Sequence, residues 1–268
     1  MKKLTLLILS IIAFSCNTDD EMTNETEYSE FITGTLIETE INFMPEEIFN
    51  TNEVQEPSLK LKLVSSEIFP CVNYSLSTTE FTKGSELIIR FDEIIEPEIC
   101  LTAFGPAVSY IDLPLNTNKV TFINGNTIDK YSIDINQEKV SLTLIEKNFT
   151  SLLYDKTFRI PENSFAYVCG TNTNNTNIYL DFFTILEQNL DFEEFEFEGE
   201  GRIPYPETTD GNWVNHPSKF YKYSGFEEFN DLGSILNDYS SENIEENSGV
   251  TISIYNWNNI KFYSWIEN

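Results

Sequence analysis

The stretch from residue 199 to residue 223 holds the side chains of this chain that are best suited to chemistry. His216 is the one histidine, and beside Trp213 and Asn215 its imidazole could act as a general base or contact a ligand. Glu200 and Glu207 lie in the same stretch, and glycoside hydrolysis needs two carboxyl groups at a set separation. Because the chain has 44 acidic residues, such clusters form by chance, so we predict no catalytic residues and no enzymatic activity.

The aromatic and hydrogen-bonding residues of this stretch instead favour a binding site. Flat aromatic faces beside a few donors suit contacts with sugars or peptides. Long loops in compact domains are also often functional. The predicted binding residues are Arg202, Tyr205, Trp213, His216 and Tyr221. The alternative is that these rings pack beneath their own loop, and the sequence leaves both interpretations open.

The chain lacks the sequence motifs of common metal, nucleotide and hydrolase sites. One histidine cannot build a His-rich zinc site, and no pair of Cys or His residues has ligand spacing. The chain also contains no P-loop, dinucleotide fingerprint, H-E-x-x-H or G-x-S-x-G motif. We therefore predict no metal and no cofactor. A net charge of −28 repels nucleic acid, which excludes DNA and RNA as expected partners.

The cysteine count leaves one thiol unpaired in an oxidising compartment if Cys16 carries lipid. Without Cys16, three cysteines remain and three pairings are open. We favour a disulfide between Cys71 and Cys100, which lie in neighbouring strand-like segments; it would stabilise the fold by about 3–4 kcal/mol. Cys169 ends an apolar run without a basic neighbour, so we expect a buried and inert thiol.

The first sixteen residues resemble the signal of bacterial lipoproteins. Lys2 and Lys3 precede an apolar stretch over residues 4–14, which is shorter than the roughly 20 residues that span a bilayer. Ala13-Phe14-Ser15-Cys16 resembles a lipobox, with small residues on either side of Phe14, which departs from the usual pattern. The resemblance implies a signal peptide over residues 1–15 and lipid on Cys16. Ordinary secretion with an unmodified cysteine is the alternative.

The residues that follow Cys16 resemble the export signal of Bacteroidetes surface lipoproteins. This signal is an acidic cluster, here Asn17-Thr18-Asp19-Asp20-Glu21. The resemblance implies an outer-membrane lipoprotein of the bacterial cell envelope that faces the medium. Residues 16–29 are polar and without periodicity, so we expect a flexible acidic tether.

Residues 30–150 have the pattern of an all-β domain. Residues 59–63, 131–135 and 140–144 alternate between apolar and polar side chains, and Asn124-Gly125 is a turn signal between strands. Six to eight short strands without an intervening helix predict a β-sandwich of the immunoglobulin or fibronectin kind.

Residues 151–268 have a mixed pattern. Helical spacing of apolar residues predicts helices over residues 178–190 and 226–239, although Gly233 is unfavourable inside the second helix. Strand patterns cover residues 165–169, 192–197, 219–223 and 250–254, and residues 261–266 could close a hairpin with the last strand. The order β-α-β, loop, β-α-β predicts a ferredoxin-like (split βαβ) α+β domain.

These patterns together predict a membrane-anchored envelope protein with a non-catalytic binding or adhesion role. Its expected partners are the membrane, through the lipid, and a glycan, a peptide or another envelope protein. The first alternative is a carbohydrate-binding accessory lipoprotein that captures substrate for an outer-membrane uptake system. The second is an envelope hydrolase.

Overall fold

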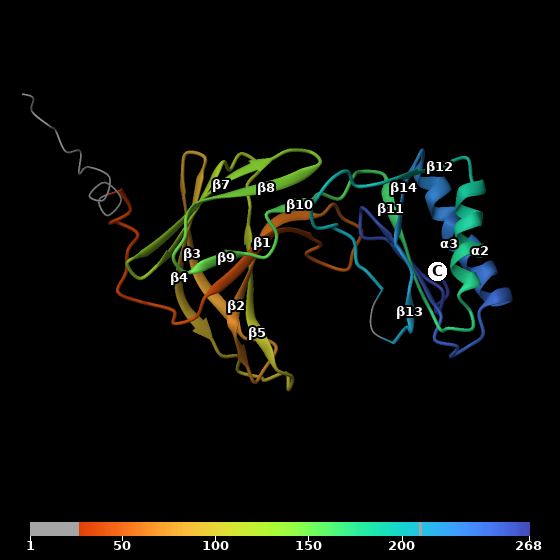
Figure 1. Cartoon of the computed structure of the whole chain (residues 1–268), viewed down its shortest axis with the longest axis horizontal. Helices are drawn as coiled ribbons and strands as arrows, with labels where there is room; N and C mark the ends of the chain where they lie inside the picture. Colours follow the sequence, from red (N-terminus) through yellow and green to blue (C-terminus); the bar gives the residue numbers. More distant parts are fainter. Residues whose placement is uncertain (1–26, 209–210) are drawn as a thin grey trace, which may run out of the picture.

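The computed structural model describes residues 27–208 and 211–268, and this part of the chain is rich in β-structure. The strands form three sheets; the first two lie together near the N-terminus, and the third lies beside them with both helices of the described residues (Figure 1). The predicted β-rich architecture is confirmed. The signal peptide and the lipidation of Cys16 lie outside the described residues.

Two sheets make up the N-terminal part of the structure. The first has the strand order β5-β2-β1-β9, with β1 (Ile41–Ile48), β2 (Ser58–Phe69), β5 (Gly105–Asp112) and β9 (Thr150–Leu152). The second has the order β10-β8-β7-β6-β4-β3, with β3 (Ser75–Lys83), β4 (Glu86–Ile95), β6 (Lys119–Asn124), β7 (Thr127–Ile135), β8 (Lys139–Glu146) and β10 (Lys156–Phe158). The strand pairs are antiparallel, apart from the parallel pairs β1–β9 and β4–β6.

The two sheets pack face to face around an apolar core. The ring of Phe43 in the first sheet lies 4.6 Å from the ring of Phe122 and 4.8 Å from that of Tyr131, both in the second sheet. Leu61 and Leu63 are fully buried in the same core. Because alternate residues of a strand point to opposite faces, each alternating segment gives one apolar face to this core. The N-terminal part is therefore a β-sandwich.

The third sheet has the strand order β12-β14-β11-β15-β16, and its neighbouring strands are antiparallel. A short strand also pairs with the end of β11. The strands are β11 (Ser164–Thr171), β12 (Phe192–Phe195), β13 (Val214–Asn215), β14 (Lys219–Tyr223), β15 (Thr251–Asn256) and β16 (Lys261–Tyr263). The predicted hairpin between residues 250–254 and 261–266 is confirmed by the pairing of β15 with β16.

Both helices, α2 (Asn177–Gln188) and α3 (Phe226–Asn243), lie on the side of the third sheet that faces away from the sandwich (Figure 1). Their buried residues, among them Phe182 and Phe229, pack against Phe165 and Tyr167 of β11. Both predicted helices are confirmed, and α3 continues beyond residue 239. Gly233 lies where an added Cβ would come within 3.1 Å of the ring of Phe262, so close packing on β16 explains this glycine.

A polar and apolar interface joins the sandwich to the third sheet. Phe49, which follows β1, packs with an apolar cluster on the sheet face opposite the helices. The carboxylate of Glu47 accepts hydrogen bonds from Arg159 Nε at 2.8 Å and from the backbone N–H of Ile160 at 2.6 Å. The side-chain amide of Asn259 donates to backbone carbonyls of residues 51 and 53. These contacts fix the two parts against each other.

The first described residues are bound to the sandwich. The sequence predicts a flexible tether through Ser29, whereas Tyr28 is fully buried against the second sheet beside Ile88 and Ile123. Its hydroxyl donates to Glu86 Oε1 at 2.8 Å and accepts from Lys119 Nζ at 2.7 Å. An aromatic residue within a polar run thus anchors the chain.

The predicted domain boundary at residue 150 differs from the observed pairing. Strand β9 begins at residue 150 and β10 comes after it, yet they pair with β1 and β8 of the sandwich. The change from the sandwich to the third sheet therefore falls between Phe158 and Ser164.

Candidate binding site on the open face of the third sheet

The face of the third sheet opposite the helices carries small residues along its centre. Ala166 and Val168 of β11 lie beside Tyr255 and Ser253 of β15, and residues that pair directly point to the same face. Near β12 and β14 this face is covered by an apolar cluster that includes Tyr205 and Phe197 of the following loop and Phe49 of the sandwich. Toward Thr251 and β16 the face borders a hollow at the surface, although Val168 and Ser253 themselves are buried. We call this remaining part the open face.

The loop over residues 203–208 borders two hollows beside the open face. The smaller hollow, of about 210 Å³, lies over the centre of the sheet, with Val168, Ser253 and Thr251 in its lining. The larger hollow, of about 470 Å³, lies toward residues 215–218 and Phe220. Glu207 and Thr208 line both hollows. The loop therefore forms a ridge with a recess on each side.

Three aromatic residues form one wall of the smaller hollow. Tyr255 and Tyr263 meet edge to face with their ring centroids 6.1 Å apart, and Tyr263 lies 4.7 Å from Trp265. The side chain of Trp265 is 55% exposed. Glu207 in the same lining offers a carboxylate, and Thr251 and Ser253 offer hydroxyl groups. A recess with aromatic faces and convergent polar groups can bind a small polar ligand.

The side chain of Asn212 ties the following part of the loop to β15. Its amide donates to the carbonyl oxygen of Gly249 at 2.8 Å, and its Oδ1 accepts from the hydroxyl of Thr251 at 3.2 Å. Asn212 also packs so closely on Gly170 that a Cβ there would lie 2.3 Å from its side chain. The position of the loop beside the hollow is thus set by specific contacts.

His216 lines the larger hollow at the edge formed by β11 and β13. Its Nε2 lies 2.9 Å from the hydroxyl of Thr171, and its ring stacks on Tyr179 of α2 with a centroid distance of 4.5 Å. Burial lowers the pKa of His216 below its usual value. A neutral imidazole that stacks on a tyrosine and bonds a hydroxyl can contact a ligand in this hollow.

Of the five predicted binding residues, the structure brings Tyr205 and His216 together. Both line the larger hollow. Tyr205 is buried, with its hydroxyl 2.6 Å from the hydroxyl of Ser164, and its ring stacks on Phe220. Burial raises the pKa of Tyr205 well above its usual value. Tyr205 therefore shapes the wall of the hollow and offers it little polar surface.

The other three predicted residues lie elsewhere. Arg202 donates to Glu46 Oε1 at 2.5 Å and belongs to the interface with the sandwich. Tyr221 is fully buried on the helix side of the sheet, stacked on Phe165. Trp213 is 79% exposed and lines neither hollow.

The aromatic wall of the smaller hollow was not among the predicted binding residues. The sequence does contain a signal for it, because Tyr263 and Trp265 are two residues apart in the predicted hairpin. In a strand, a period of two would direct both rings to one face, with Phe262 on the other; in the structure, β16 ends at Tyr263 and Trp265 lies in the turn that follows. What the sequence does not show is that this face stays uncovered beside Glu207.

The cysteines follow the predicted arrangement within the described residues. Cys71 and Cys100 form a disulfide with a Cα–Cα distance of 5.3 Å, and Cys169 is a buried free thiol. Burial raises the pKa of Cys169 to about 11, although a hydrogen bond with Tyr167 acts in the opposite direction. A thiol with this pKa is protonated at neutral pH and is a poor nucleophile.

The described residues contain neither a metal-binding group nor a membrane-spanning helix. Within residues 27–208 and 211–268, no group of three or more His, Cys, Asp or Glu side chains is placed to hold a metal ion. Neither helix in this part of the chain is long and apolar enough to span a bilayer.

Comparison with known proteins found no match to this chain among protein families, curated proteins or solved structures.

Proposed function

We propose that this chain is an outer-membrane lipoprotein that binds a ligand without catalysing a reaction. The lipobox-like segment at Cys16 supports the anchor, and the acidic cluster after it supports exposure at the cell surface. The Cys71–Cys100 disulfide is in keeping with an exported chain, because such bonds persist in oxidising compartments.

One observation carries the binding role: the smaller hollow, whose lining includes the contacting rings of Tyr255, Tyr263 and Trp265 together with Glu207. Partly exposed aromatic rings grouped in a recess often mark a binding site. Contact between the rings also fixes their positions. Because few side chains need to be ordered on binding, little conformational entropy is lost.

Carbohydrate is the ligand class that this hollow fits best. The apolar faces of sugar rings stack on aromatic side chains, while their hydroxyls bond to carboxylates and hydroxyls such as those of Glu207, Thr251 and Ser253. The net charge of −28 disfavours anionic ligands, so a neutral glycan is expected. This supports the capture of glycans, as in the accessory protein of an uptake system.

The test is a glycan array probed with the mature chain carrying Cys16→Ser, which keeps the protein soluble. Trp265→Ala removes the exposed ring of the proposed site, and Trp213→Ala removes an exposed ring outside it. We expect glycan binding to be weakened at least about tenfold by Trp265→Ala and unchanged by Trp213→Ala. Equal binding by both variants, or no binding to any neutral glycan, would contradict the proposal.

We also infer finer assignments for the two parts of the fold. For the C-terminal part, the strand order β12-β14-β11-β15, with antiparallel neighbours and both helices on one face, supports the split βαβ arrangement. For the sandwich, two packed sheets support an immunoglobulin- or fibronectin-like fold. The parallel pairs β1–β9 and β4–β6 are departures from that pattern.

A further inference from the structure

The end of the sandwich that carries the disulfide exposes many large apolar side chains. The most exposed is Phe104, at 81%. The segments that carry them meet, because the backbone N–H of Val72 donates to the carbonyl of Leu101, and β2 pairs with β5 at this end. We call this set the apolar tip: Ile68, Val72, Ile95, Ile99, Leu101 and Phe104. Soluble monomers rarely leave so many large apolar groups together in water without a function.

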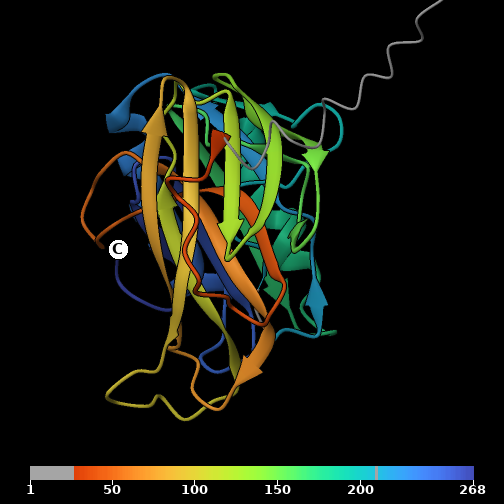
Figure 2. The same ribbon diagram turned by 90° about the vertical axis from the view of Figure 1, so that its left-hand side faces the viewer.

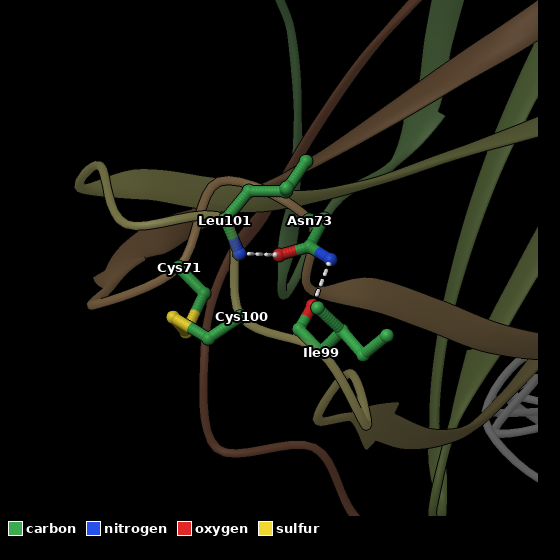
Figure 3. The surroundings of a disulfide bond; sticks show 5 residues. All are labelled: Cys71, Asn73, Ile99, Cys100 and Leu101. Carbon is green, nitrogen blue, oxygen red and sulfur yellow. Dashed lines mark hydrogen bonds between the residues drawn. A yellow bond between two sulfur atoms is a disulfide. The ribbon is translucent and has the colours of Figure 1, made fainter.

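The loop that carries Ile99, Leu101 and Phe104 is held in a fixed shape. The Cys71–Cys100 disulfide ties it to the end of β2 (Figure 3). Asn73 adds two bonds on either side of Cys100: its amide donates to the carbonyl of Ile99 at 2.8 Å, and its Oδ1 accepts from the N–H of Leu101 at 3.0 Å. A loop that is already ordered loses little entropy when it binds, which favours affinity.

The charge around the apolar tip is negative. Glu67, Glu93, Glu96 and Glu98 are exposed in the segments that carry it. No lysine or arginine occurs between Arg90 and Lys119 in the sequence. A surface that binds here must therefore offer apolar contacts at its centre and positive charge at its edge.

We propose that the apolar tip docks a protein partner with an apolar cleft that is rimmed by lysine or arginine side chains. Exposed apolar anchors inside a charged rim are the usual composition of a protein interface. This surface is separate from the smaller hollow of the third sheet and adds a second interaction to the proposed function.

The acidic rim argues against two other occupants. An anionic membrane surface would be repelled by the four glutamates, and a second copy of the chain would bring like charges together. The tip also lies at the opposite end of the strands from the first described residues, which lead toward the expected anchor (Figure 2). A protein can therefore reach the tip without contacting that segment.

The experiment places benzoylphenylalanine, a photo-cross-linking residue, at position 104 of the full chain in its native host. A second version carries it at position 154, where Tyr154 is also an exposed aromatic residue of the sandwich. The proteins that cross-link from position 104 and not from position 154 are identified by mass spectrometry, purified and titrated against the Cys16→Ser chain.

We expect one specific protein, with an affinity that falls at least about tenfold in the double variant Ile99→Ser/Phe104→Ser. Leu190→Ser, at a residue that is 99% exposed in the C-terminal part, should leave the affinity unchanged. Raising the salt concentration should weaken binding, because the rims carry opposite charges. The pair Cys71→Ser/Cys100→Ser keeps the apolar groups and should weaken binding to a smaller extent.

Three results would overturn the proposal. They are cross-links from position 104 to lipid alone, cross-links to a second copy of the chain, and a set of products identical to that from position 154. Glycan binding by the third sheet is measured with separate variants, so the two proposals can fail independently.

Discussion

At the scale of single residues, His216 is a side chain whose ionisation falls near physiological pH. It stacks on Tyr179 and bonds the hydroxyl of Thr171 in a partly buried position. Burial disfavours the charged imidazolium and lowers its pKa in the folded protein. Since the pKa in the unfolded chain is the higher of the two, acidification protonates the unfolded state first.

We therefore expect His216 to make the protein less stable as the pH falls below about 6.5, the unperturbed pKa, and through the lower folded value. Above that range both states are neutral and its contribution does not depend on pH. Nuclear magnetic resonance can follow the folded pKa without assignment, because the chain has one histidine. Urea unfolding between pH 5 and 7 should depend less on pH in His216→Gln. A folded pKa at or above 6.5 would contradict this expectation.

At the scale of elements, two buried tyrosines on opposite faces of the third sheet differ in the hydrogen bonding of their hydroxyl groups. Tyr221 of β14 is fully buried against the helices, and its hydroxyl has no hydrogen-bond partner among the described residues. Tyr205 lies over the other face, with its hydroxyl bonded to Ser164. Burial of a polar group without a partner is unfavourable, and loss of a buried hydrogen bond is unfavourable as well.

Removal of the two hydroxyls should consequently have opposite effects. We expect Tyr221→Phe to raise the free energy of unfolding by about 1 kcal/mol and Tyr205→Phe to lower it by about 1 kcal/mol. Urea denaturation of the two variants and the wild type measures both values. Destabilisation by Tyr221→Phe would show that its hydroxyl has a bonding partner.

The elements themselves were largely predictable from the sequence, because their periodicity reports burial. Residues 59–63 and 131–135 lie in strands, and the Asn124-Gly125 turn joins β6 to β7, with Gly125 at a φ of 60°. Gly233 illustrates the limit of local reasoning. Its low helix propensity is outweighed by the close approach of Phe262, a contact that only the tertiary structure creates.

The candidate site was less predictable than the elements. Sequence reasoning identified the loop and two residues that share a hollow, Tyr205 and His216. It could not tell that Arg202 would turn to Glu46, or that Tyr221 would point to the helix side. Which face of a strand is covered depends on distant segments, and a single sequence does not specify their positions.

At the scale of the whole molecule, ion pairs and apolar contacts hold the sandwich and the third sheet together. The Glu47 carboxylate is central, since its side chain is 2% exposed and bonds both Arg159 and the backbone of Ile160. Removing one partner of a buried pair leaves an uncompensated charge.

Glu47→Gln should therefore lower the free energy of unfolding by about 3 kcal/mol, measured by urea denaturation. The matched control is Asp112→Asn, which breaks the exposed pair with Lys60 and should change stability by less than about 1 kcal/mol. Equal effects of the two substitutions would show that the interface does not depend on this pair.

The fixed arrangement gives the molecule two separate surfaces for interaction. The apolar tip lies at one end of the sandwich, and the smaller hollow lies on the third sheet. In our proposal, the lipid-anchored chain holds a glycan in the smaller hollow while the apolar tip docks a protein partner.

The most direct test of the glycan proposal is hydrogen–deuterium exchange with a neutral oligosaccharide selected from the array. We expect slower exchange at residues 207 and 208 and in β15 and β16, which contribute to the lining of the smaller hollow. Exchange that is unchanged there, or slowed only elsewhere in the chain, would contradict the proposed site.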